Sequence, residues 1–75
     1  MENQLLVLFG ERIRNARLSK KLSQEQLGSL ADLDRTYVSG VERGKRNVSL
    51  LNIYKLSIAL NISMSSLLDF EVDDE

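Results

Sequence analysis

The sequence contains no cysteine, no histidine and no proline. Without cysteine the chain can form neither a disulfide framework nor a thiolate metal site, and we expect to find it in a reducing cytoplasm. Most acid–base, nucleophilic and metal-dependent catalysis depends on histidine or cysteine, and the sequence also has no glycine-rich loop that could hold a phosphate. We therefore expect a protein that is not an enzyme and that binds no metal and no cofactor.

The sequence also lacks a long hydrophobic run. The apolar residues 5–9 are too few for the core of a signal peptide or for a membrane span, and the preceding Met1-Glu2-Asn3-Gln4 has an acid and no base. We therefore expect a soluble protein that is not exported and has no membrane partner. At 75 residues the chain is one small domain. Such a domain buries only about 60% of the surface of its unfolded chain, so dimerisation would add stability.

Charge is distributed unevenly along the chain, although the net charge is only −1. Residues 1–68 carry ten bases and six acids, whereas five of the eleven acids lie within residues 69–75. We therefore predict a positively charged domain, residues 1–68, and an acidic tail, residues 69–75. Clusters of bases are typical of solvated faces, and they are also the electrostatic footprint of a phosphate-binding surface. The clusters are Arg12, Arg14, Arg17, Lys20 and Lys21, and then Arg43, Lys45 and Arg46.

The spacing of apolar residues predicts a first helix from residue 3 or 4 to about residue 20. Its core-facing stripe consists of Leu5, Phe9, Ile13 and Ala16. Arg17 lies beside this stripe, where a buried guanidinium would need a carboxylate partner. Glu42 is the candidate partner, and the alternative is that Arg17 is an ordinary exposed arginine.

The segment from Ser23 has the residues of a capping box, in which Ser23 accepts from the backbone three residues on and Gln26 returns to the Ser23 amide. A second helix is therefore predicted from this point. Its apolar face consists of Leu27, Leu30 and Ala31. The helix ends before Asp34, and so short a connection to the next helix is typical of a helix-turn-helix. The exposed N-terminus of the second helix, with Ser23 and Gln24, is suited to bind a phosphate because unpaired N–H groups point outward.

The third helix is predicted between Asp34, which can cap it, and Gly44, which can adopt the left-handed conformation that ends a helix. Its inner face has only Val38 and Val41. The opposite side carries three residues able to make specific hydrogen bonds, Arg35, Thr36 and Ser39. Gly40 would allow DNA or another backbone to approach closely. The alternative is a solvated surface helix, but this arrangement is suited to presenting side chains in a major groove.

Two more helices are predicted after the basic loop. Ser49 caps a fourth that reaches about Leu60, and Ser63 caps a short fifth from Met64 to about Leu68. The core face of the fourth consists of Leu50, Ile53, Leu56, Ala59 and Leu60. More apolar residues remain than one small core needs, so we predict a surface for self-association, the alternative being that they wrap the core. That surface consists of Leu51, Tyr54, Ile58, Leu67, Leu68 and Phe70.

Three segments together resemble the lambda-repressor-like (Xre) helix-turn-helix family. They are residues 22–27 (LSQEQL), residues 33–43, and residues 42–47 (ERGKRN) followed by Ser49-Leu50. The resemblance covers about residues 5–68. The small size of the chain and the start of the third helix, Asp34-Arg35-Thr36-Tyr37, are most similar to the controller proteins of restriction–modification systems. The resemblance implies a compact, all-α, five-helix DNA-binding domain of the lambda-repressor type.

The resemblance also implies a role for each residue of the motif. Gln24 would contact phosphate and support the first turn of the recognition helix, and Arg17 would pair with Glu42 beneath the motif. Base edges would be reached by Arg35, Thr36 and Ser39. The DNA backbone would be held by Ser23, Gln24, Tyr37, Arg43, Lys45, Arg46 and Asn47. Gly28 and Val48 differ from the usual Ala and the frequent Pro of the family, and close helix packing demands a small residue at Gly28.

These features predict a homodimeric transcriptional regulator that binds an inverted-repeat operator in double-stranded DNA. It would act as a repressor or an activator, with its own promoter and a restriction–modification operon as candidate targets and RNA polymerase as a candidate further partner. The alternatives are a phage- or plasmid-type repressor and a protein-interaction module, such as an antitoxin, on the same fold.

Overall fold

The computed structural model describes residues 2–72, which contain five α-helices and no strand. In chain order they are α1 (Glu2–Ser19), α2 (Gln24–Ala31), α3 (Arg35–Glu42), α4 (Leu50–Leu60) and α5 (Met64–Leu67). The predicted all-α, five-helix architecture is confirmed, with α1 beginning and ending slightly earlier than expected. Within residues 2–72 no helix combines the length and the apolar character that a membrane crossing requires.

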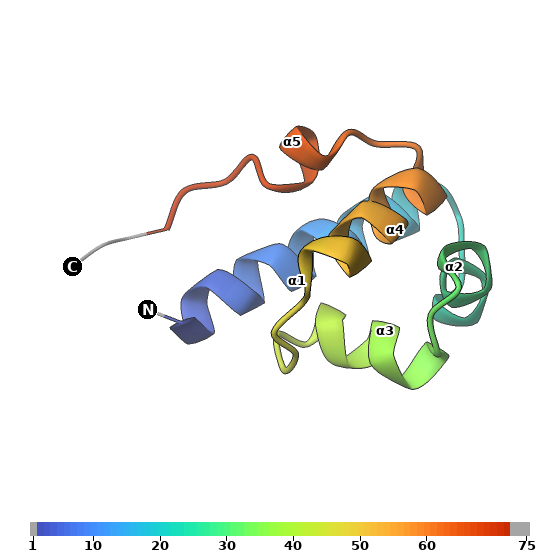
Figure 1. Ribbon diagram of the computed structural model, residues 1–75, viewed down its shortest axis with the longest axis horizontal. Coiled ribbons are helices and arrows are strands. Elements are labelled where there is room, and N and C mark those ends of the chain that lie inside the picture. The colour runs from blue at the N-terminus through green and yellow to red at the C-terminus, as the bar shows by residue number, and fades with distance from the viewer. Residues whose placement is uncertain (1, 73–75) are drawn as a thin grey trace.

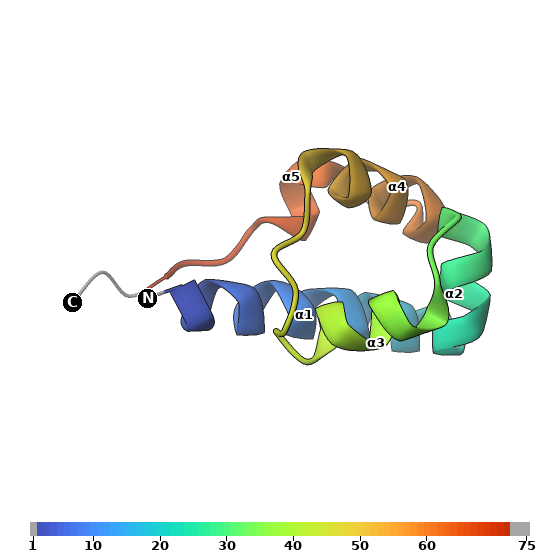
Figure 2. The ribbon, with the colours of Figure 1, turned by 60° about the horizontal axis from the view of Figure 1, so that its bottom comes forward.

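The helices are arranged around α1, the longest of them (Figures 1 and 2). α3 packs against α1 and α2, and α4 packs against α2 and α5. In both views α2 lies at the far end of α1, and the segment after α5 returns toward the start of α1. Phe70, in that segment, is half-buried against the core, two residues beyond the predicted end of the domain. Residues 73–75 of the predicted acidic tail lie outside the described residues.

Side-chain caps fix where the helices begin. Ser23 Oγ accepts from the Gln26 N–H at 3.0 Å and Gln26 Oε1 accepts from the Ser23 N–H at 2.8 Å, so the predicted capping box is present. The oxygens of Asp34, Ser49 and Ser63 cap α3, α4 and α5 in the same manner. These bonds satisfy backbone donors that a helix leaves unpaired in its first turn.

The core lies between α1 and the other four helices. Nine apolar side chains are buried in it: Phe9, Ile13, Leu27, Ala31, Val38, Val41, Leu56, Leu60 and Leu67. Val38 and Val41, both at most 2% exposed, fix the inner face of α3. The short helix α5 is attached through Leu67, its single buried residue.

Four of the predicted side-chain positions are wrong. Leu67 was expected on the self-association surface but is fully buried, because it is the side chain through which α5 packs into the core. Leu30 is 61% exposed, since the buried face of α2 is centred on Leu27, Gly28 and Ala31. Leu50 is 70% exposed because the buried residues of α4 all lie in its second half. Leu5 is 45% exposed, near the open end of α1.

Candidate nucleic-acid interface

The connection between α2 and α3 is a tight turn built on the backbone. Asp32 adopts the left-handed conformation, with φ 58° and ψ 47°, and the Leu33 N–H donates to the Gly28 carbonyl at 2.8 Å. A Cβ on Gly28 would lie 2.5 Å from the Leu33 carbonyl oxygen, so the turn requires glycine here. The prediction that position 28 needs a small residue is therefore confirmed, and the atoms that leave no room for a larger one belong to the turn.

α3 has one buried side and one open side. Val38, Gly40, Val41 and Glu42 are buried, whereas Arg35 and Thr36 are exposed and Ser39 is half-buried. Asp34 Oδ2 accepts from the Thr36 backbone N–H at 3.0 Å and so caps the start of the helix. The three residues predicted to read bases therefore belong to the side of α3 that does not pack against the core.

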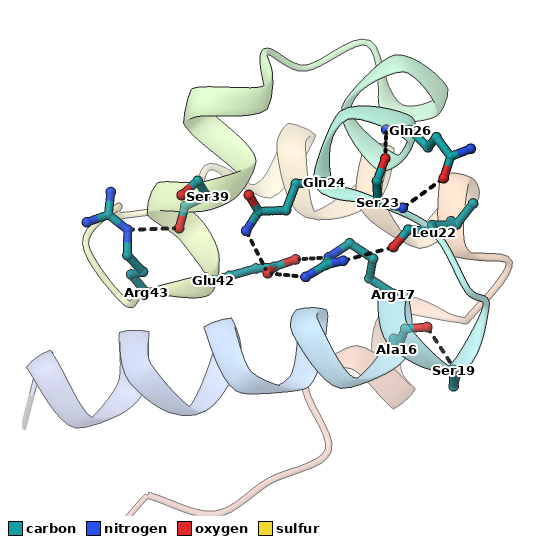
Figure 3. A network of polar contacts seen from close by, with 10 residues as sticks. All are labelled: Ala16, Arg17, Ser19, Leu22, Ser23, Gln24, Gln26, Ser39, Glu42 and Arg43. Carbon is teal, nitrogen blue, oxygen red and sulfur yellow. Dashed lines mark hydrogen bonds and ion pairs between the residues drawn. The ribbon is translucent and has the colours of Figure 1, made fainter.

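An ion pair beneath α3 joins it to α1 and α2 (Figure 3). Arg17 Nε donates to Glu42 Oε2 at 2.6 Å and Arg17 Nη2 donates to Glu42 Oε1 at 3.0 Å. Arg17 Nη1 donates to the Leu22 carbonyl at 2.8 Å. The hydrogen bonds and the charge of Glu42 raise the pKa of Arg17 above its ordinary value, against burial, which lowers it. The predicted partner of Arg17 is thus present, and the pair is buried.

Gln24 is part of this network rather than of the surface. Its Nε2 donates to Glu42 Oε1 at 3.1 Å, as Figure 3 shows, and the residue is half-buried. The family resemblance implied support for the first turn of the recognition helix. The contact is instead with Glu42, the last residue of α3, because the start of α2 faces that end of the helix. The Gln24 side-chain amide is therefore directed inward, and its predicted phosphate contact is not supported by this orientation.

A basic loop follows α3. Arg43, Lys45, Arg46 and Asn47 are all exposed, and Gly44 between them has φ +72°, the left-handed conformation predicted for it. Arg43 Nε reaches back to the Ser39 carbonyl at 3.4 Å. These cations lie directly after the helix that presents Arg35, so positive charge continues from α3 into the loop.

Arg46 lies along α3 rather than extending freely. Its guanidinium carbon is 5.3 Å from the centroid of the Tyr37 ring. Asn52 Nδ2, from α4, donates to the Tyr37 hydroxyl oxygen at 3.1 Å. Gly40 was expected to admit DNA or another backbone, but the Arg46 side chain covers it, with Cγ 3.0 Å from the position that a Cβ would take.

The first predicted cluster of bases is smaller at the surface than the sequence indicates. Arg17 is buried with Glu42, and Arg12 donates through Nε and Nη2 to the Ser66 carbonyl at 2.9 and 2.7 Å. Arg12 thereby joins α1 to α5. Arg12 makes this contact while it stays exposed, and Arg14, Lys20 and Lys21 are exposed as well.

Exposed apolar residues gather around two hollows. The first, of about 210 Å³, lies between α2 and α4, and Leu30, Tyr54 and Ile58 are among its walls. Leu51, also exposed, completes the predicted stripe of α4. The second hollow, of about 110 Å³, includes Leu68 and Phe70. The sequence placed Leu30 on the core-facing side of α2 and so did not predict it as part of this exposed patch. Its position at the edge of the apolar face of α2 was the available indication.

Comparison with known proteins identifies the family. The family model described as "Helix-turn-helix" matches residues 13–67. Control protein C.BamHI of Bacillus amyloliquefaciens is 54% identical over 71 residues, covering 93% of this chain and 88% of that protein. The crystal structure of the restriction–modification controller protein C.AhdI from Aeromonas hydrophila has 60% identity and a TM-score of 0.82, covering 83% of this chain and 94% of that one. The chain belongs to the helix-turn-helix family of restriction–modification controllers.

A third comparison places this fold on DNA. The controller protein C.Esp1396I has been solved as a tetramer in complex with its natural 35 base-pair operator. That structure is 34% identical to this chain with a TM-score of 0.80, covering 87% of this chain and 86% of that one. The chain therefore shares its fold with a controller protein that has been solved on its operator.

Proposed function

We propose that this chain is the controller of a restriction–modification operon. In this role it binds an inverted-repeat operator as a homodimer and regulates transcription, its own promoter included. The proposal rests on one observation: α3 is fixed from beneath by Val38, Val41 and the Glu42 ion pair, while Arg35 and Thr36 are exposed. A short helix fixed in this way, after a tight turn, is the arrangement that enters a major groove.

The DNA-binding side chains fall into two groups, those that contact bases and those that contact phosphates. Arg35, Thr36 and Ser39 on α3 contact base edges, where a guanidinium can donate two parallel hydrogen bonds to guanine. The phosphates are held by Tyr37, Arg43, Lys45, Arg46 and Asn47, with Ser23 at the start of α2. Phosphate contacts fix the position of a protein on DNA, whereas base contacts select the sequence.

The homodimer forms through the exposed stripe of α4. Leu51, Tyr54 and Ile58 are 63%, 52% and 63% exposed, and Leu30 extends the patch across the hollow beside α2. Contiguous apolar surface of this kind marks an interface. Leu68 and Phe70, at the other hollow, form a second contact with the partner. A two-fold axis would place the two copies of α3 in successive major grooves, about 34–36 Å apart.

The remaining features follow from this role. The domain of residues 1–68 carries out the binding and the acidic residues after it do not contact DNA, since phosphates repel them. The protein acts in the cytoplasm, without a catalytic step. Where it activates transcription, RNA polymerase is its second protein partner.

Selection of bound duplexes from a random pool, followed by gel retardation, tests the proposed function. We expect an inverted repeat to be enriched and to stay bound in the presence of competitor DNA at moderate salt. Binding that is blind to sequence and lost with modest salt would contradict the proposal and would favour the protein-interaction alternative.

A further inference from the structure

The Arg46 side chain occupies a defined track on α3. Tyr37 and Gly40 are three residues apart, so they share one face of the helix. Arg46 Cγ and Nε pass 3.0 and 3.2 Å from the position that a Cβ on Gly40 would take, and the guanidinium carbon stands 5.3 Å from the Tyr37 ring centroid. The aliphatic part of Arg46 thus lies on the one residue of α3 that lacks a side chain, and its charge lies over the Tyr37 ring.

The far end of this track is fixed by α4. Asn52 Nδ2 donates to the Tyr37 hydroxyl at 3.1 Å. The Asn52 backbone is held in the first turn of α4, because its N–H donates to the capping oxygen of Ser49 at 3.1 Å. The orientation of the Tyr37 ring therefore depends on a residue outside the helix-turn-helix.

We propose that Tyr37, Gly40 and Asn52 form a cradle that presets Arg46 for a phosphate of duplex DNA. The inference rests on the proposed function: it adds Gly40 and Asn52 as positioning residues and gives Tyr37 a positioning role beside its phosphate contact. A free arginine loses conformational entropy when a contact fixes it, and a side chain that is already ordered loses less. A cation held over an aromatic ring also keeps its charge, so Arg46 in the cradle remains able to bind an anion.

Double-mutant cycles on operator and scrambled duplexes, at several salt concentrations, test the cradle. Arg46→Ala should weaken binding to both duplexes about tenfold per half-site. It should also lower the slope of log K against log salt by about one per protomer. Asn52→Leu should weaken binding to both duplexes by about two- to tenfold per half-site, which is the cost of ordering one long side chain. The slope of log K against log salt should not change. In the Arg46→Ala background Asn52→Leu should cause a much smaller loss, because most of its effect passes through Arg46 and only the contact of Tyr37 with phosphate remains to be disturbed.

Gly40→Ala separates positioning from folding. Alanine favours a helix more than glycine does, and the nearest atoms that the new methyl group meets all belong to Arg46. We therefore expect an unchanged or higher thermal midpoint together with about two- to tenfold weaker DNA binding per half-site. In the Arg46→Ala background this loss should disappear. Lys45→Ala is the matched control: it removes a neighbouring cation outside the track, so its effect should add to that of Gly40→Ala.

A readout without DNA completes the test. The Arg46 Nε–H resonance of the free protein should show a ring-current shift from Tyr37, reduced in Gly40→Ala and Asn52→Leu. Losses that simply add to that of Arg46→Ala, or variants that bind as wild type does, would overturn the cradle while leaving the proposed function intact. A wild-type protein that does not prefer its selected operator over a scrambled duplex would remove the proposed function and the cradle together.

Discussion

Arg17 and Glu42, 25 residues apart in the chain, form a two-point ion pair in which Nε and Nη2 reach separate carboxylate oxygens at 2.6 and 3.0 Å. Both residues are less than 9% exposed. The pair ties the end of α3 to α1, and the same guanidinium also binds the Leu22 carbonyl just before α2. The position of α3 therefore depends on this arginine as well as on the buried Val38 and Val41.

Removal of either partner should destabilise the domain. Arg17→Ala or Glu42→Ala leaves the other charge buried without compensation, a loss of about 3–5 kcal/mol in the free energy of unfolding. Arg17→Lys should also destabilise, because an ammonium cannot reproduce the parallel pair of donors. Urea melts at a fixed protein concentration measure this, with exposed Arg14→Ala as the control. Variants within about 0.5 kcal/mol of wild type, the range of an ordinary surface substitution, would show that the pair contributes little.

Gly28→Ala should destabilise although alanine is the better helix former. The new Cβ would lie 2.5 Å from the Leu33 carbonyl oxygen, and the turn backbone must move to admit it. We expect a loss of about 1–3 kcal/mol, as for other overpacked sites. Ser29→Ala, at the exposed neighbouring position, is the control for helix propensity. A Gly28→Ala protein with a thermal midpoint equal to or above that of wild type would contradict the steric requirement.

Leu67 and Leu68 should behave differently when shortened. Leu67 is fully buried, so Leu67→Ala should cost about 2–5 kcal/mol in unfolding free energy. Leu68 is 43% exposed, and Leu68→Ala should cost much less in the monomer. Chemical unfolding of both in the Ile58→Asp background excludes a contribution from dimerisation. Equal losses would show that Leu67 does not anchor α5 alone.

Ile58→Asp should yield a folded monomer. A carboxylate placed in the exposed stripe of α4 would be desolvated in a dimer interface but remains solvated in the monomer. Operator binding should then weaken far more than half-site binding, since the second half-site no longer gains from linkage. Sedimentation and helical content are the measurements, with Asn15→Asp on α1 as the control for added charge. A variant still dimeric at micromolar concentration would place the interface elsewhere.

Arg35→Ala should relax sequence preference. It should cost about 1–3 kcal/mol per half-site on the operator and leave scrambled DNA nearly unaffected, since a base contact carries sequence information. Arg46→Ala should weaken both duplexes alike. Titrations of each variant on both duplexes at several salt concentrations compare them. Equal losses of Arg35→Ala on operator and scrambled DNA would make Arg35 a phosphate contact, and Thr36 and Ser39 would then be the remaining candidates for reading bases.

Much of the fold and part of the site could be predicted from the sequence. Ser23, Asp34, Ser49 and Ser63 begin helices through bonds that reach only two or three residues along the chain. The short connection between α2 and α3 is equally local. The Arg17–Glu42 pair is long-range, but it was predictable because a buried charge leaves few choices of partner.

The tertiary structure alone decided which side chains are buried and which polar groups pair, because both depend on how the helices are rotated against one another. Leu67 or Leu30 suits a core or a surface equally well by sequence, and the packing of α5 and α2 buries the first and exposes the second. Gln24 turns inward to Glu42, Arg12 is used to bind α5, and Arg46 lies over Tyr37. The sequence by itself determined the helices, their caps and the helix-turn-helix, because those rest on local hydrogen bonds and periodicity. Which polar side chains remain free for DNA was decided by the tertiary structure, because each contact joins residues that the fold alone brings together.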